Sequence, residues 1–146
     1  MTFTIIRNVF LSSLFVSFYS GAALAEMRPN FSAIYSNFRD IDSITICMAA
    51  MNLESTRADR SKNRAQISYA NMMVEKSIYV ATIMIKTRGL SVDAIKKKVH
   101  FYSVAAEHET SANYERCRGR LNSSVTEVTT IDPNRDPRDI FNQRHR

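Results

Sequence analysis

The residues best suited to chemistry are Glu107, His108 and Glu109, which follow one another directly in the chain. A histidine beside carboxylates can transfer protons or bind a metal ion. The helix of a zinc protease needs a second histidine four positions after the first, and residue 112 is alanine instead. His100 lies about two helical turns before His108, too far for both to hold one ion without further ligands. The pattern therefore predicts no metal site and favours a His108 that is exposed near a helix end.

Other catalytic patterns are missing from the sequence as well. Beyond position 26 the glycines are Gly89 and Gly119, so no glycine-rich loop can cradle a phosphate. No serine stands in a nucleophile elbow, and no two carboxylates can be placed a few ångströms apart from the sequence. We therefore predict that the protein is not an enzyme and uses no cofactor. An enzyme based on His108 with Glu107 or Glu109 is the competing hypothesis.

The chain carries a net charge of +6, and part of this excess is gathered in two short runs. Together they form the candidate basic patch, whose members are Arg57, Arg60, Lys62, Arg64, Lys96, Lys97 and Lys98. Such a surface could bind anionic polymers or a membrane surface through interactions that weaken with salt. Nucleic acid is disfavoured because the first run has no aromatic side chain for base stacking before Tyr69. The simpler interpretation is that both runs are solvated faces.

Residues 1–25 have the pattern of a secretory signal peptide. Arg7 supplies the positive start, residues 9–19 form an apolar run, and residues 23–25 (Ala-Leu-Ala) offer small side chains to a signal peptidase. The apolar run is shorter than the roughly 20 residues that span a bilayer, which disfavours an uncleaved anchor. Cleavage would leave residues 26–146, in which no second segment is long and apolar enough to cross a membrane. We therefore expect a periplasmic or extracellular protein.

Both cysteines, Cys47 and Cys117, remain after removal of the signal peptide. An even number of cysteines in an exported chain indicates a disulfide, and two cysteines allow a single intramolecular pairing. Such a bond would close a loop of about 70 residues, which the chain-entropy model values at about 4 kcal/mol. It would tie the first firm helix to the last. Two buried free thiols and an intermolecular bond are the alternatives, and a cysteine nucleophile is disfavoured in an oxidising compartment.

The longest helical pattern covers residues 61–89, and we expect the other helices to pack against it. Ser61 is its expected cap, and Gly89 stands where a helix often ends in a left-handed conformation. Lys76 lies off the apolar stripe, whose members recur at steps of three and four: Ile67, Ala70, Val74, Ala81 and Ile85. Methionines beside the stripe are assigned to the core, with an adaptable binding groove as the alternative.

Shorter patterns precede this central helix. A first firm helix is expected over 43–53, capped by Asp42 or Ser43. The stretch 54–63 is polar and lacks apolar periodicity, so it is either a linker or the exposed start of the central helix. The lead-in over 26–41 is mixed in character, and we expect an extended arm or a short helix there.

The C-terminal part is predicted to be helical first and disordered afterwards. Ser91 caps a helical pattern over 91–121, which is one helix or two, the second capped by Thr110 or Ser111. Residues 123–146 are polar, contain two Asp-Pro steps and lack a helical stripe, which is typical of a disordered tail. No stretch of the chain has a strand pattern that would build a sheet.

These elements predict an all-α fold, a small bundle of three to four helices over 42–122 that is stapled by one disulfide. At the level of architecture the chain resembles small periplasmic helical proteins with a signal peptide and one disulfide. The immunity proteins that neutralise type VI secretion amidase toxins are one such group. The resemblance covers about 42–121 and rests on the Cys47 and Cys117 framework and on the helix order. It implies an exported protein that binds and blocks a partner enzyme.

The function expected from the sequence is therefore that of an exported, non-enzymatic protein-binding module, of the inhibitor or immunity type. The basic character of the chain favours an acidic protein as its partner. The alternative function is binding of anionic polymers or a membrane surface through the candidate basic patch.

Overall fold

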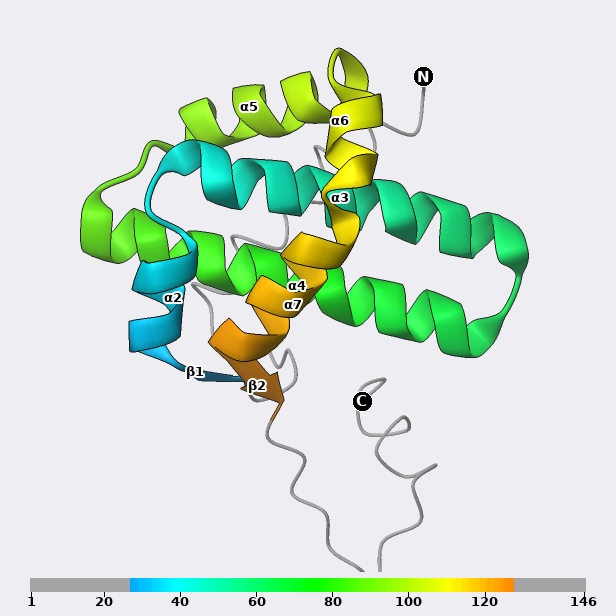
Figure 1. The fold of residues 1–146 in the computed structure, drawn as a ribbon, viewed down its shortest axis with the longest axis horizontal. Helices are drawn as coiled ribbons and strands as arrows, with labels where there is room; N and C mark the ends of the chain where they lie inside the picture. Colours follow the sequence, from blue (N-terminus) through cyan, green and yellow to red (C-terminus); the bar gives the residue numbers. More distant parts are fainter. Residues whose placement is uncertain (1–26, 128–146) are drawn as a thin grey trace, which may run out of the picture.

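The computed structural model describes residues 27–127, and every structural statement below refers to this part of the chain (Figure 1). The predicted signal peptide and the predicted tail beyond residue 127 lie outside the described residues. Six helices and one antiparallel ribbon occur within 27–127, which confirms the all-α class. Their bounds are β1 Met27–Pro29, α2 Phe31–Asn37, α3 Ile41–Ser61, α4 Arg64–Arg88, α5 Val92–Val104, α6 Glu107–Ala112, α7 Tyr114–Ser124 and β2 Val125–Glu127.

Two long helices, α3 and α4, lie side by side and form a hairpin on which the other elements pack (Figure 1). The turn between them takes two residues. Lys62 adopts a left-handed conformation with φ of 56°, and the Asn63 side chain accepts hydrogen bonds from the backbone N–H groups of Ala65 and Gln66. Asn63 therefore caps α4, whereas the predicted cap, Ser61, is the last residue of α3.

Helix α3 continues through most of the stretch 54–63, so both predicted alternatives, a linker and the exposed start of the central helix, are wrong. The physical reason is that small side chains on one side of this stretch still face α4. Ser55 and Ala58 are only 5% and 7% exposed, and the Ser55 hydroxyl donates a 3.0 Å hydrogen bond to Asn71 Oδ1 of α4. A search for large apolar residues overlooks such positions, although small residues allow two helices to approach closely.

The start of α3 is fixed by a capping box one turn long. The Asp40 carboxylate accepts a 2.8 Å hydrogen bond from the Ser43 N–H, and the Ser43 hydroxyl accepts one of 3.3 Å from the Asp40 N–H. The cap is therefore Asp40 and not Asp42 or Ser43, and α3 begins earlier than predicted.

Helix α4 is buried more widely than its apolar stripe indicates. Three residues of the stripe are buried, namely Ala70, Val74 and Ala81. The other two, Ile67 and Ile85, are partly buried. Lys76 lies off the stripe yet is only 6% exposed, and its ammonium donates a 3.0 Å hydrogen bond to Asn122 Oδ1 of α7. Gly89 ends the helix with φ of 66°, as predicted.

The core lies where α2, α5 and α7 meet the α3–α4 hairpin. Its largest fully buried side chains come from every one of these elements and from β2: Ile34, Phe38, Ile44, Met48, Met51, Met73, Ile78, Val80, Met84, Ile95, Leu121 and Val125. Met48, Met51, Met73 and Met84 therefore fill the core, as the sequence favours, and Met72 packs against it partly buried.

The stretch 91–121 is divided among three helices, not the one or two predicted. Ser91 caps α5 as predicted. The corner between α5 and α6 is closed by the Thr110 hydroxyl, which donates a 2.7 Å hydrogen bond to the Tyr102 carbonyl. Thr110 is thus a buried residue of α6 and not a cap, and Asn113 precedes α7 without a side-chain capping hydrogen bond.

A short β ribbon joins the two ends of the described chain, although the sequence predicts no strand. Met27 pairs with Glu127 and Pro29 with Val125, and the Asn30 N–H extends the ladder to the Ser124 carbonyl at 2.8 Å. Three-residue strands are too short to show a period-two pattern. Residues 123–127 therefore belong to the fold, so the predicted boundary of the tail at 123 is wrong, and the lead-in holds β1 and α2.

The cap of α4 gives a test of the hairpin turn. Asn63→Ala should lower the free energy of unfolding by about 1 kcal/mol, because two helix N–H groups lose their acceptor. Asn63→Gly is the matched control and should cost only a few tenths of a kcal/mol, since glycine leaves these groups open to water. Urea denaturation followed by circular dichroism measures both, and equal losses for the two variants would contradict the role of the Asn63 side chain.

Candidate functional site

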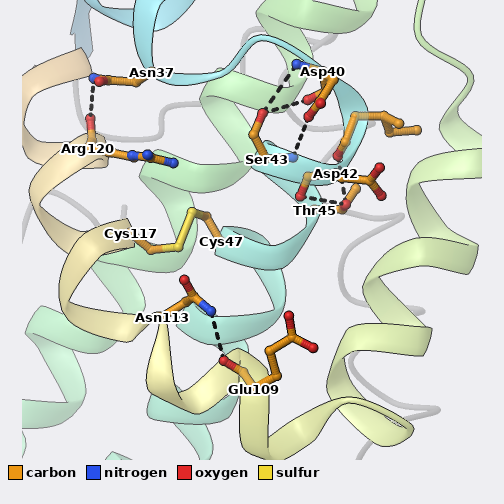
Figure 2. Close-up of a disulfide and its surroundings, with 11 residues drawn as sticks. Asn37, Asp40, Asp42, Ser43, Thr45, Cys47, Glu109, Asn113, Cys117 and Arg120 are labelled. Atoms are coloured by element: carbon orange, nitrogen blue, oxygen red, sulfur yellow. Dashed lines mark hydrogen bonds between the residues drawn. A yellow bond between two sulfur atoms is a disulfide. The ribbon is translucent and has the colours of Figure 1, made fainter.

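One disulfide joins α3 to α7 at the centre of the fold (Figure 2). Cys47 and Cys117 are 70 residues apart in the chain, their Cα atoms lie 5.2 Å apart, and both side chains are buried. The predicted intramolecular pairing is confirmed, and the alternative of two free thiols is wrong. The bond fixes how α7 crosses the hairpin, which α7 contacts on both α3 and α4.

This crossing places Tyr114 of α7 above the polar end of the hairpin, which is the end that holds the turn at Lys62 and Asn63. Tyr114 precedes Cys117 by one helical turn, and Glu54 follows Cys47 by about two turns. Both Tyr114 and Glu54 therefore lie toward the turn at Asn63, where they border a surface hollow between α3, α4 and α7. The sequence placed Tyr114 on the Cys117 face of its helix, and it is partly buried there.

We call this feature the tyrosine hollow, and it has a volume of about 260 Å³. Its base is formed by two buried alanines, Ala58 of α3 and Ala70 of α4, which are 7% and 4% exposed. Tyr69 stands at its edge with 38% of its surface exposed. The complete lining is Glu54, Arg57, Ala58, Gln66, Tyr69, Ala70 and Tyr114.

Charged groups surround the tyrosine hollow in close contact with one another. Arg57 donates from Nη1 to Glu54 Oε2 at 3.4 Å and from Nη2 to the Ser111 hydroxyl at 3.0 Å. On α7, Arg118 pairs with Glu115 at 2.7 Å. These contacts hold the two guanidinium groups in place at the surface, where they can still donate to an incoming acceptor.

The surroundings of the tyrosines also shift two pKa values. Burial, and to a smaller degree the charge of Glu54, raises the pKa of Tyr114, so its hydroxyl stays protonated and can donate a hydrogen bond. The hydrogen bond to Tyr69, followed by the contact with Glu115, raises the pKa of Arg118. The hollow therefore presents the neutral phenol of Tyr114 and the ion pair of Arg57 with Glu54, and Arg118 lies beside Tyr69.

The candidate basic patch is divided into two separate groups. Arg57, Arg60, Lys62 and Arg64 are all exposed around the turn of the hairpin, next to the tyrosine hollow. The three lysines of α5, Lys96, Lys97 and Lys98, lie near the other end of α3, because Lys98 pairs with Asp42 at 2.7 Å. Asp42 and Arg60 are 18 residues apart on one helix, a distance of about 27 Å. The two groups therefore do not form one continuous patch.

The histidine cluster forms no closed site in the described part of the chain. Glu107, His108, Glu109 and His100 are all exposed. Within residues 27–127 no three side chains of histidine, cysteine, aspartate or glutamate are placed to hold a metal ion. His145 lies outside the described residues.

The sequence does not reveal that Tyr69 and Tyr114 meet, since they are 45 positions apart and on different helices. One feature of the sequence does predict the position of Tyr114. It precedes Cys117 by one helical turn, so the disulfide to Cys47 also brings Tyr114 close to α3. The small residues Ala58 and Ala70 are the second signal, since facing alanines leave space between two helices.

Comparison with known proteins adds no relative to this picture. No family model, curated protein or solved structure matches the chain. The resemblance to immunity proteins therefore stays a prediction. Among the helices within 27–127, none is both long and apolar enough to cross a membrane.

The disulfide gives a direct test of what holds α7 in place. The Cys47→Ala/Cys117→Ala variant should lose about 4 kcal/mol of unfolding free energy, as expected for the release of a 70-residue loop. Alanine is chosen because serine would bury two hydroxyl groups. Guanidinium denaturation measures the loss, with reduced wild-type protein as the control. A loss below about 1 kcal/mol would show that packing alone positions α7.

The α5–α3 contact gives a test by titration. Hydrogen bonds from Lys98 and then Tyr102 lower the pKa of Asp42. The contact therefore adds stability above the ordinary aspartate pKa and loses it as the pH falls through the lowered one. Lys98→Met should raise the pKa of Asp42, as read from its side-chain NMR shift. Lys97→Met, the matched control, should leave it unchanged, and equal shifts in both variants would contradict the assignment.

Proposed function

We propose that this protein is an exported, non-enzymatic binding module that holds an acidic partner protein at the tyrosine hollow. The observation that carries the proposal is the hollow itself, where Tyr69, Tyr114 and Arg57 gather around an apolar base. Tyrosine and arginine are enriched at protein interfaces and dominate their binding energy. Partly buried rings that are already held in place lose little conformational freedom when a partner binds.

The charge around the hollow supports an acidic partner. Arg57, Arg60, Lys62 and Arg64 lie around the turn of the hairpin, with Asp59 among them. The nearby carboxylates Glu54 and Glu115 are each paired with an arginine, Glu54 with Arg57 and Glu115 with Arg118. A surface of one dominant sign attracts the opposite sign before contact and speeds association. This attraction weakens with ionic strength, so a partner held by it should bind more slowly in high salt.

Export is supported by the disulfide. The bond between Cys47 and Cys117 is intramolecular and buried, and such bonds persist in oxidising compartments and are rare in the cytosol. Together with the signal pattern of residues 1–25, it favours a periplasmic or extracellular location. The resemblance to immunity proteins would make the partner an enzyme that this protein blocks.

A second candidate function, binding to an anionic membrane surface, is favoured by one observation on α5. Phe101 and Val104 are 53% and 51% exposed, and the exposed Lys97 lies one turn before Phe101 on the same side of the helix. Apolar and basic side chains on one exposed face are typical of helices that lie in a membrane interface. No residue of this face lines the tyrosine hollow, so the two candidates can be separated by substitution.

Capture from an extract of the cell envelope tests the proposal. Immobilised wild-type protein should retain a partner. Tyr69→Ala should bind that partner about thirtyfold more weakly, because an interface tyrosine of this kind contributes roughly 2 kcal/mol. The matched control is Tyr35→Ala, which removes a tyrosine of nearly equal exposure, 36% against 38%, from α2. This control should retain the partner fully.

Two outcomes would contradict the proposal. Equal capture by wild type and Tyr69→Ala would place binding elsewhere on the surface. Loss of capture in Phe101→Ser but not in Tyr69→Ala, together with salt-sensitive sedimentation on anionic lipid vesicles, would establish the membrane alternative.

A further inference from the structure

We infer that the tyrosine hollow accepts one large apolar side chain from an acidic segment of the partner. This inference rests on the proposed function and specifies what the partner must present. It is carried by three properties of the hollow, namely its size, its apolar base and the placement of its charges.

The hollow is smaller than a typical small-molecule site. Its volume is about 260 Å³, whereas sites for small molecules and cofactors run from roughly 300 to 1,000 Å³. The hollow has room for one large side chain, and it is open to the surface, so a side chain of another protein can enter it. The space exists because Ala58 and Ala70 face each other where larger residues would close it.

The base of the hollow offers apolar contacts to an inserted side chain. Ala58 and Ala70 offer methyl groups there, and the rings of Tyr69 and Tyr114 stand beside them. A phenylalanine or leucine that enters would exchange water for these contacts. An aromatic ring would gain further from the tyrosine rings, which prefer offset or edge-to-face contacts.

The charges determine what flanks the inserted side chain. Glu54 lies in the lining, so a carboxylate pushed into the hollow would meet a like charge. The Arg57 guanidinium, at the exposed edge of the lining, has more N–H donors than its contacts to Glu54 and Ser111 use. Carboxylates are therefore favoured on either side of the inserted residue and disfavoured in its place.

A lysine or arginine inserted toward Glu54 is the competing occupant. Glu54 already lies 3.4 Å from Arg57, and Arg118 stands near Tyr69 on α7. A third cation would be repelled by both guanidinium groups, and the exposed basic residues of the turn would repel a basic segment before contact. A segment with an apolar residue at its centre and acidic residues on both sides avoids repulsion by the guanidinium groups and by the basic residues of the turn.

The test uses three acetylated pentapeptide amides and the mature chain, residues 26–146, with its disulfide intact and labelled with ¹⁵N. The first peptide has phenylalanine between two pairs of acidic residues, the second has alanine at the centre, and the third has phenylalanine between two pairs of lysines. Amide shifts are followed during titration. The first peptide should give saturable shifts centred on Ala58, Tyr69, Ala70 and Tyr114, and should bind at least about tenfold more tightly than the others.

Two variants show whether binding uses the hollow. Ala58→Leu fills its base and should abolish the shifts, and Arg57→Glu reverses the charge at its edge and should weaken the first peptide at least about tenfold. Arg57 is exposed, so this variant keeps the test valid if Ala58→Leu does not fold. Lys97→Glu on α5 is the matched charge reversal and should have little effect, because it lies far from the hollow.

The outcomes separate this inference from the proposed function. Absence of saturable shifts, equal binding of the alanine-centred peptide, preference for the lysine peptide, or shifts on another face would each overturn the inference. If the envelope partner is still lost in Tyr69→Ala in that case, the hollow remains the binding site and accepts a different group. If that loss is also absent, the proposed function fails as well.

Discussion

The bond between Cys47 and Cys117 is the constraint on which the packing of α7 against the α3–α4 hairpin depends. A two-residue turn is enough to set the antiparallel α3–α4 hairpin, but α7 returns to α3 only after 70 residues of chain. Closing so long a loop costs conformational entropy, which a covalent bond removes from the unfolded state. The bond is buried with Leu121 and Val125, so covalent and apolar contacts act at the same crossing. The position of Tyr114 over the hairpin follows from that crossing.

The polar end of the hairpin shows how the fold and the candidate site use the same residues. Small side chains at Ser55, Ala58 and Ala70 let α3 and α4 lie close together without a large apolar seam. The same small side chains leave the space that becomes the tyrosine hollow once α7 crosses above it. Stability at this end therefore comes from helix capping at Asn63 and from the Ser55–Asn71 hydrogen bond, while the hollow stays open to solvent.

The sequence predicts the all-α class, the disulfide, the stripe of α4 and its end at Gly89, because each leaves a strong local signal. It fails where the signal is non-local or carried by small residues. The extension of α3 to Ser61 depends on contacts of Ser55 and Ala58 with another helix, and the β ribbon depends on residues about 100 positions apart. The tyrosine hollow belongs to the same class, since only the crossing of α7 brings Tyr114 to Tyr69.

Photo-crosslinking in the producing cell would test the central claim most directly, because it records which surface the partner touches. A benzophenone amino acid would replace Gln66, which lines the tyrosine hollow, or Phe101, which is exposed on α5. The account predicts a covalent adduct of one defined protein from position 66 and none of that protein from position 101. An adduct from position 101 with none from position 66 would contradict it and would place the partner on α5.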